Sequence, residues 1–399
     1  MKIKYINSNF DNIINNKNIN QTILNTIKNL PSLNIVLNKN LLEETKIVSN
    51  QFKKNKDKIV IFGTGGSNLG AKALHNIILN PDISLEFYDN VDPFNFEKNF
   101  KNIDFDSTGF LVVSKSGKTP ETLSQFSCLY QKAIEANKVQ KFFSNTLIIT
   151  EFIDSPLFTI AKENKCLLLE HQKEIGGRYS IFTNVGLVPA IISGLNIDEL
   201  FSGASDVMNN IDRYSPYDLG RYLTHKGNTH FKNNVLMTYS DSLYFFGKWY
   251  LQLWAESIGK KNKGITALHA VGTTDQHSQL QLYLDGPRDK YFTFITSDHS
   301  NKGLKINDQF FKNTNIDYFK DKTMGDLMQA EQSATVETFK LNNFNFREIY
   351  LPTLDERNLG KLLSFSIMET IASCMYLDVD PFDQPAVEQG KKLTQTYLR

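Results

Sequence analysis

Short apolar runs alternate with longer amphipathic stretches over most of the chain. Residues 58–62, Lys-Ile-Val-Ile-Phe, form an apolar run of strand length closed by Gly63, and residues 68–79 have the apolar spacing of a helix. Further strands are predicted at residues 85–88, 109–113, 147–149, 167–169, 234–238, 290–295 and 346–351. Further helices are predicted at residues 119–136, 180–195, 197–210, 243–257, 357–377 and 385–398. This alternation indicates an α/β fold in which parallel sheets are flanked by helices on both faces.

The alternation is interrupted once, by a helical stretch over residues 180–210, and then starts again. The chain has 399 residues, and single cores stop growing at roughly 250–300 residues. We therefore expect two α/β domains, each with its own parallel sheet, at residues 51–205 and 206–384. We expect residues 1–50 to form an N-terminal helical segment and residues 385–399 to form a C-terminal helix.

The composition excludes several classes of partner. The net charge is +1, so no broad positive field indicates binding to nucleic acid or to an anionic membrane. The three cysteines are odd in number and include no CxxC pair, which is typical of reduced thiols in the cytoplasm. The first residues are polar and lack the apolar core of a signal peptide. The longest apolar stretch, residues 185–195, is interrupted by Gly, Pro and Ser and is shorter than the about 20 residues that span a bilayer.

Two loops between a strand and a helix have the composition of anion sites. The first, residues 63–70, reads Gly-Thr-Gly-Gly-Ser-Asn-Leu-Gly. Glycines such as Gly66 let the backbone N–H groups approach a ligand closely, with the Ser67 hydroxyl beside them. Asn68 occupies the third glycine position of the dinucleotide pattern GxGxxG, so that pattern is not met. Taken alone, this loop is equally well interpreted as a tight turn from strand to helix.

The second loop, residues 114–122, reads Ser-Lys-Ser-Gly-Lys-Thr-Pro-Glu-Thr. Hydroxyl groups, a lysine and a helix N-terminus together favour a phosphate monoester site. A nucleotide-binding P-loop is excluded, because it requires a glycine at the position of Val112, which lies inside the preceding strand. We also expect Thr119 to cap the following helix and Pro120 to be its first residue.

Residues able to carry out acid–base chemistry are dispersed along the chain. Metal-ligand spacings such as HExxH or CxxC are absent from the sequence, as is the GxSxG elbow, and no metal or organic cofactor is expected. Arg178 follows two glycines, and Glu256 ends a helix rich in aromatic residues. His277 and Lys391 each stand near the start of a predicted helix. From these positions alone, a solvent-exposed or structural role is the more frequent one for each.

The order of these motifs resembles that of the glucose-6-phosphate isomerase family from about residue 58 to the C-terminus. The segments that carry the resemblance are residues 63–70, 114–122, 176–180, 256–260, 272–278 and 382–391. The Gly-Gly-Arg-Tyr-Ser segment around Arg178 and the segment from Gln384 to Lys391 are the most specific of them. The family's fold consists of two sugar-isomerase (SIS) domains, each a parallel sheet between helices, in agreement with the pattern above.

The resemblance implies an enzyme that interconverts glucose 6-phosphate and fructose 6-phosphate without metal or cofactor. It implies that Glu256 is the base that moves a proton between C1 and C2, and that Arg178 stabilises the enediolate. His277 and Lys391 would assist ring opening, and Gln384 would support the substrate. The implied phosphate ligands are Ser114, Lys115, Ser116 and Thr119, with Gly66 and Ser67 nearby. The family pattern also implies a homodimer in which His277 reaches the site of the partner subunit.

Two alternatives remain open from the sequence. The SIS fold accommodates several sugar phosphates, so the enzyme could also act on mannose 6-phosphate. SIS domains also serve as sugar-phosphate sensors, which need the loop at residues 114–119 but not Glu256, His277 and Lys391 together. The presence of all three residues favours the enzyme.

Overall fold

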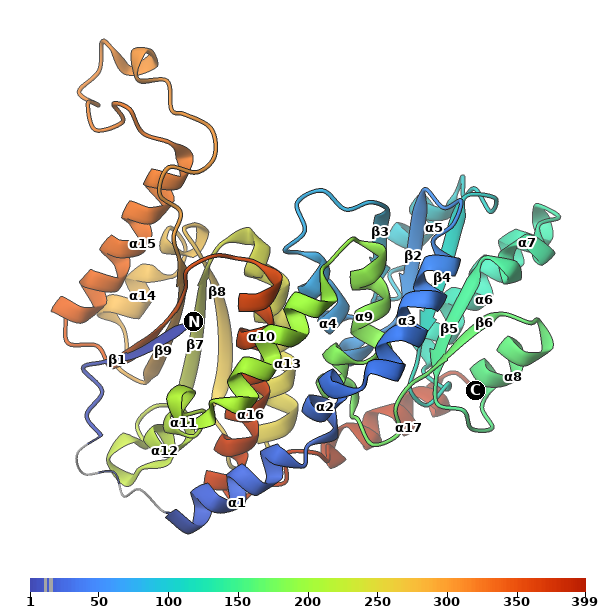
Figure 1. The fold of residues 1–399 in the computed structure, drawn as a ribbon, viewed down its shortest axis with the longest axis horizontal. Coiled ribbons are helices and arrows are strands. Elements are labelled where there is room, and N and C mark those ends of the chain that lie inside the picture. The colour runs from blue at the N-terminus through green and yellow to red at the C-terminus, as the bar shows by residue number, and fades with distance from the viewer. Residues whose placement is uncertain (11–12, 14–16) are drawn as a thin grey trace.

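The computed structural model of the protein describes residues 1–10, 13 and 17–399. The described chain forms two five-stranded sheets with helices packed between them and on their outer faces (Figure 1). Within these residues, no helix is long and apolar enough to cross a membrane.

The first sheet has the strand order β3-β2-β4-β5-β6, and all its strands are parallel. Its strands are β2 (Lys58–Phe62), β3 (Ser84–Tyr88), β4 (Thr108–Val113), β5 (Thr146–Thr150) and β6 (Leu167–Glu170). The chain goes from β2 outward to β3 and then back across to β4, so the order reverses between β2 and β4. In open parallel sheets, ligands bind at such a reversal, beyond the carboxyl ends of the strands.

The first sheet is buried on both faces because successive side chains of a strand point to opposite sides. Val60, Phe62 and Val112 pack against one group of helices, and Ile59 and Ile61 pack against another. The first group is α5 (Pro93–Phe100), α6 (Pro120–Glu135), α7 (Val139–Ser144) and α8 (Pro156–Glu163), and the second is α3 (Lys39–Phe52) and α9 (Asn184–Ile192). The near-continuous apolar strands of the sequence follow from this burial on two sides.

The second sheet has the order β1-β10-β9-β7-β8. Its strands are β1 (Lys2–Ile6), β7 (Asn233–Tyr239), β8 (Thr266–Gly272), β9 (Lys290–Ser297) and β10 (Phe346–Leu351). Four of them are parallel, whereas β1 pairs antiparallel with β10, Lys2 lying opposite Tyr350. The prediction of a wholly parallel second sheet is therefore corrected at this edge.

Helices between the two sheets join them through one continuous apolar core, which includes Leu200, Trp254 and Leu363. The helices that contribute to it are α4 (Leu69–His75), α10 (Ile197–Asn209), α12 (Asp218–Thr224), α13 (Tyr244–Ile258) and α16 (Glu356–Tyr376). The outer face of the second sheet is covered by α14 (Leu280–Asp285) and α15 (Met324–Leu341). A short helix, α11 (Ile211–Tyr214), follows α10.

The predicted N-terminal helical segment contains α1 (Lys17–Lys28), α2 (Pro31–Asn34) and α3, and β1 precedes them. The sequence pattern missed two strands, β1 and β8. They are the two edges of the second sheet, and most of their side chains are exposed or partly exposed. Edge strands of this kind lack the largely apolar runs from which most of the other strands were predicted.

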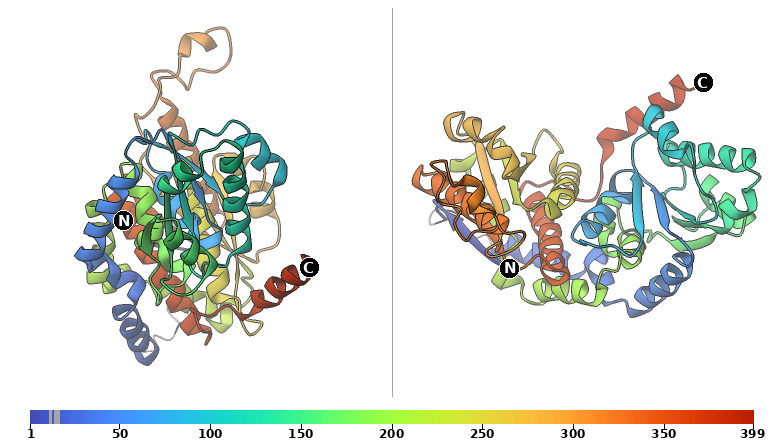
Figure 2. Two further views of the ribbon diagram at one scale, coloured as in Figure 1. Left: turned by 90° about the vertical axis from the view of Figure 1, so that its right-hand side faces the viewer. Right: turned by 90° about the horizontal axis from the view of Figure 1, so that it is seen from above.

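Two segments extend away from this body. The C-terminal helix α17 (Glu388–Tyr397) has every residue exposed, and Figure 2 shows it projecting beyond the sheets. Residues 298–323, between β9 and α15, form an irregular excursion at the upper left of Figure 1. Large apolar side chains of both segments face solvent, among them Leu304 and Phe310 at 82% exposure and Tyr397 at 82%.

Candidate active site

The two predicted anion loops lie side by side at the carboxyl edge of the first sheet. Phe62, at the end of β2, is paired with Val112 in β4, so Gly63 and Ser114 leave the sheet at neighbouring positions. These are the strands between which the chain order reverses. The topology thus brings together two loops that are about fifty residues apart in sequence.

The Ser114–Thr119 loop is closed by its own hydroxyl groups. The Oγ of Ser114, which is buried, lies 2.8 Å from the Oγ1 of Thr119. Ser116 and Lys118 are exposed, and Gly117 has a φ of +63°, a left-handed conformation that suits glycine. Thr119 occupies the N-cap position of α6 and Pro120 follows as its first residue, as predicted. The expected cap is not made: the Thr119 hydroxyl forms no hydrogen bond with the helix N-terminus and lies against Ser114.

Lys115 connects this loop to the loop that carries Arg178. Its Nζ donates to the carbonyl oxygens of Lys173 at 2.8 Å and Ile175 at 3.0 Å, and lies 3.5 Å from Oε1 of Glu151. We expected the ammonium group to face a phosphate. In this structure the ammonium group instead binds the chain just before Gly176. Only the backbone of Lys115 therefore faces the loop at residues 114–119.

The glycine loop packs against the arginine loop with no room for a side chain. A Cβ atom added to Gly66 would lie 2.1 Å from the carbonyl carbon of Gly177. The Ser180 hydroxyl donates to the carbonyl oxygen of Gly66 at 3.3 Å. This contact gives Gly66 a physical role, since only glycine lets the two backbones approach so closely. Ser67 follows it, partly exposed, in the short 3-10 helix η2 (Gly65–Ser67).

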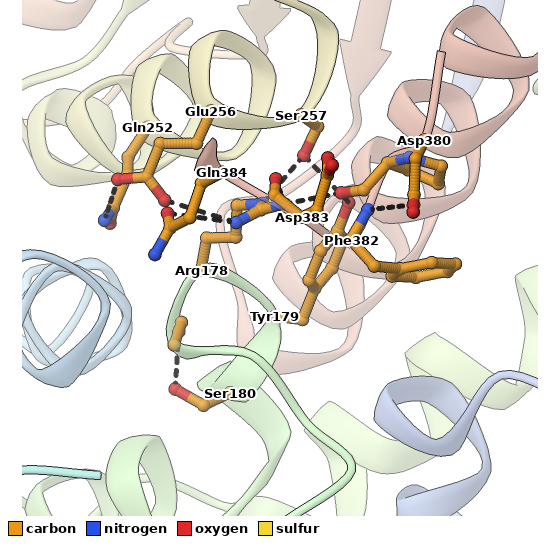
Figure 3. A network of polar contacts seen from close by, with 12 residues as sticks. Arg178, Tyr179, Ser180, Gln252, Glu256, Ser257, Asp380, Phe382, Asp383 and Gln384 are labelled. Carbon is orange, nitrogen blue, oxygen red and sulfur yellow. Dashed lines mark hydrogen bonds and ion pairs between the residues drawn. The ribbon is translucent and has the colours of Figure 1, made fainter. Parts of the chain in front are cut away.

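Arg178 is the centre of the polar network in Figure 3 and is 3% exposed. Its Nε donates to the Ser257 hydroxyl at 2.9 Å, and its Nη2 donates to the carbonyl oxygens of Pro381 at 2.6 Å and Asp383 at 3.1 Å. Its Nη1 lies 3.4 Å from Oε2 of Glu256 and 3.3 Å from Oε1 of Gln384. A fixed, planar cation therefore faces two of the predicted site residues.

Glu256, near the end of α13, is held through both carboxylate oxygens. Oε2 faces Arg178, and Oε1 accepts a hydrogen bond from Nε2 of Gln252 at 2.9 Å (Figure 3). Its side chain is 31% exposed, so a ligand can reach it. Gln252 lies one helical turn earlier and was missed by the sequence analysis. The signal available was its spacing of four residues from Glu256, which places both side chains on one face of the helix.

Ser257 and Tyr179 extend the network away from the carboxylate. The Tyr179 hydroxyl donates to the Pro381 carbonyl oxygen at 2.9 Å and lies 2.8 Å from the Ser257 Oγ. Burial raises the pKa of Tyr179 to about 12, so the phenol keeps its proton and remains a donor. Ser257 consequently accepts from Arg178 and donates to Tyr179, which fixes the guanidinium on the side away from Glu256.

His277 and Lys391 are not part of this network. Glu256 stands two residues before the end of α13, whereas His277 follows the carboxyl end of β8. The helix and the strand run in opposite directions, and seven strand residues span about 20 Å, so the two side chains lie near opposite ends of the second sheet. Lys391 is exposed on α17, where its Nζ pairs with Oε1 of Glu388 at 2.6 Å. Among the described residues, no three His, Cys, Asp or Glu side chains gather as a potential metal site.

Comparison with known proteins shows the family of the chain. The sequence model described as Phosphoglucose isomerase matches residues 20–399. The chain belongs to the phosphoglucose isomerase family. A protein of Methanococcus maripaludis named probable glucose-6-phosphate isomerase is 34% identical over 381 residues, covering 91% of this chain and 83% of its own length. The glucose-6-phosphate isomerase of Campylobacter jejuni is 33% identical over 376 residues, covering 90% and 89%.

Solved structures agree with this membership of the phosphoglucose isomerase family. A hypothetical protein from Thermus thermophilus has a TM-score of 0.86 and 27% identity, covering 96% of this chain and 94% of its own. A glucose-6-phosphate isomerase from Chlamydia trachomatis has a TM-score of 0.75 and 21% identity, with 89% and 73% covered. At that identity the likeness shows the fold alone. The fold class is the predicted one, an α/β fold with largely parallel sheets flanked by helices.

Proposed function

We propose that the protein is an aldose–ketose isomerase that interconverts glucose 6-phosphate and fructose 6-phosphate. The observation that carries the proposal is the Glu256 carboxylate, held by Gln252 and by the buried guanidinium of Arg178. A base and a fixed cation side by side suit a reaction in which a proton leaves carbon while negative charge develops on oxygen. Membership of the phosphoglucose isomerase family supports the same substrate pair.

The phosphate would be held at the carboxyl edge of the first sheet. The hydroxyl groups of Ser114, Ser116, Thr119 and Ser67, with backbone N–H groups near Gly66 and Lys115, supply the donors. The N-terminus of α6 adds the positive end of a helix dipole. Gly66 abuts the backbone of Gly177, so a phosphate bound here would leave its sugar directed toward Arg178 and Glu256.

In the proposed proton transfer, Glu256 is the base. In the open-chain aldose, Glu256 removes the proton from C2, and the electron pair forms a C1–C2 double bond as the C1 carbonyl bond opens and leaves negative charge on O1. The hydroxyl proton then passes from O2 to O1, and the same carboxyl group returns its proton to C1 as O2 becomes the ketone oxygen. Arg178 stabilises the cis-enediolate between the two steps, and the Gln384 amide supports the sugar hydroxyl groups.

Ring opening, in the proposal, uses His277 and Lys391 as the groups that exchange protons with the ring oxygen and the anomeric hydroxyl. Within one subunit, His277 and Glu256 lie near opposite ends of the second sheet. A single subunit therefore cannot bring both side chains to the same sugar. A homodimer would supply the histidine from the partner subunit. The exposed apolar side chains of α17 and of residues 298–323 support such an assembly, because an isolated ten-residue helix is marginal in water.

Hybrid dimers test the shared site. Glu256→Gln and His277→Ala proteins should each be nearly inactive, and mixing them under conditions of subunit exchange should restore roughly a quarter of the wild-type activity. Half of the exchanged dimers are hybrids, and each hybrid contains one site with both native groups. If a mixture that has demonstrably exchanged its subunits stays inactive, His277 does not act across the interface.

The activity itself is tested by a coupled assay of purified protein with glucose 6-phosphate and fructose 6-phosphate. We expect turnover in both directions. A parallel assay with mannose 6-phosphate measures how strictly the configuration at C2 is recognised. Binding of fructose 6-phosphate without turnover, and without exchange of a C1 proton with solvent, would contradict the proposal and favour the sensor.

A cytoplasmic location is part of the proposal. Cys128, Cys166 and Cys374 are free thiols, and Cys128 is exposed. Exposed free thiols are typical of a reducing compartment.

A further inference from the structure

The segment from the end of α16 to α17, residues 377–387, carries Gln384 and leads to Lys391. Its first half is held by cationic side chains that donate to its carbonyl oxygens. Lys263 donates to Leu377 at 2.8 Å and Lys261 to Asp378 at 3.3 Å. Lys260 donates to Asp380, and Arg178 donates to Pro381 and Asp383.

Lys260 differs from the other two lysines in its burial and in its partners. Its side chain is 9% exposed, against 65% for Lys261 and 41% for Lys263. Its ammonium group meets three acceptors, which are the carbonyl oxygens of Ser257 at 2.9 Å and of Asp380, and Oδ1 of Asp383 at 3.0 Å. The two carbonyl contacts are hydrogen bonds, and the contact with Asp383 is an ion pair. This interaction is therefore more than a surface ion pair.

These three contacts join the two elements that surround Arg178. Ser257 lies beside Glu256 at the end of α13, and Asp383 lies beside Gln384 in the connecting segment. The guanidinium of Arg178 is oriented by the Ser257 hydroxyl on one side and by the carbonyl oxygens of Pro381 and Asp383 on the other. Lys260 bridges these two sides, because its ammonium group contacts Ser257 on one and Asp380 and Asp383 on the other.

We propose that Lys260 is a positioning residue that sets the orientation of Arg178 and Gln384 relative to Glu256. This inference rests on the proposed function for its kinetic consequence. Without the ammonium group, the connecting segment loses its tie to α13, and the carbonyl oxygens that aim the guanidinium shift with it. A displacement of about 1 Å in a catalytic group can cost on the order of 10²-fold in rate. The phosphate loops lie on other elements, so substrate anchoring should change little.

The test compares Lys260→Met with Lys263→Met in the full-length protein. Lys263 also donates to a carbonyl oxygen of the connecting segment, but that acceptor, Leu377, precedes the carbonyl groups that accept from Arg178, so Lys263 is the matched control. We expect Lys260→Met to lower kcat for fructose 6-phosphate at least about tenfold, with KM within about threefold of wild type. Lys263→Met should stay within about twofold in both constants. Hydrogen exchange should accelerate at residues 380–384 in Lys260→Met only.

An Asp383→Asn variant separates positioning from folding. Its carboxylate is 53% exposed and its carbonyl oxygen is retained, so the fold should be kept while the ion pair to Lys260 is lost. We expect kcat to fall about threefold in this variant, and the double variant with Lys260→Met to lose less than the product of the two single effects. If Lys260→Met does not fold, the kcat of Asp383→Asn alone tests whether the ion pair with Lys260 positions the catalytic groups.

Three results would overturn the inference. The first is a kcat of Lys260→Met equal to that of Lys263→Met, and the second is a kcat loss in the double variant equal to the product of the two single losses. The third is a change in Lys260→Met that raises KM and leaves kcat unchanged. If the wild-type protein does not turn over sugar phosphates, the proposed function fails. Hydrogen exchange then still reports whether Lys260 holds residues 380–384, and unchanged exchange in both lysine variants would reject the positioning role independently.

Discussion

Replacing Glu256 by glutamine should lower kcat for both sugar phosphates by about 10²- to 10⁴-fold, the range typical of a lost general base. An amide cannot accept the proton from C2 of the aldose or from C1 of the ketose, but it keeps the size of the side chain and can still accept a hydrogen bond from Gln252 or Arg178. KM should therefore change much less than kcat. Steady-state kinetics, together with exchange of the C2 proton with solvent, measure both effects.

Glu337→Gln is the matched control for this prediction. Glu337 lies on α15 on the outer face of the second sheet, is 51% exposed and forms an ion pair with Lys340. The same chemical change there should leave kcat within experimental error. Near-normal turnover in Glu256→Gln would show that another group moves the proton, and the proposed mechanism would be wrong.

Replacing Arg347 by methionine should lower the free energy of unfolding by about 3–5 kcal/mol, the usual cost of removing one partner from a buried ion pair. Arg347 on β10 and Glu369 on α16 are each 1% exposed and form a two-pronged pair, with Nη2 and Oε2 2.7 Å apart. The Nε of Arg347 also donates to Thr293 at 3.0 Å. The variant leaves the Glu369 carboxyl group inside the core with no cation, and chemical denaturation measures the loss.

The double variant Arg347→Met, Glu369→Leu distinguishes the ion pair from the packing around it. Replacing both members of a buried pair by apolar residues of similar volume is often neutral or stabilising. We expect the double variant to recover most of the stability lost in Arg347→Met. A double variant as unstable as the single one would show that packing, and not the unpaired charge, accounts for the loss.

The sequence identified those parts of the fold that rest on local patterns. Eight strands of the described chain were predicted, and most of them are largely apolar because their sheets are covered on both faces. The loop at residues 114–119 was found from its own composition, and its position beside residues 63–67 follows from the strand order. Glu256 and Arg178 were chosen through family resemblance, and the structure brings them within 3.4 Å.

The remaining features depend on partners that are distant in sequence. Glu151 and Ile175 determine where the Lys115 ammonium points, and neither contact can be inferred from the sequence of the loop that contains Lys115. Gln252 becomes informative only once Glu256 is known to face Arg178. The same holds for Lys260, whose partners Asp380 and Asp383 lie about 120 residues away. Such contacts are set by tertiary packing, which periodicity does not record.

The antiparallel pairing of β1 with β10 has a consequence for how the chain is made. Lys2 lies opposite Tyr350, so during synthesis β1 waits for a partner that emerges about 350 residues after it. The first sheet, residues 58–170, can form while translation continues, because its strands and covering helices α5–α8 are contiguous in sequence. The second sheet gains its final edge only after about 350 residues have been added, which makes closure of that edge a late, long-range event and a slow one.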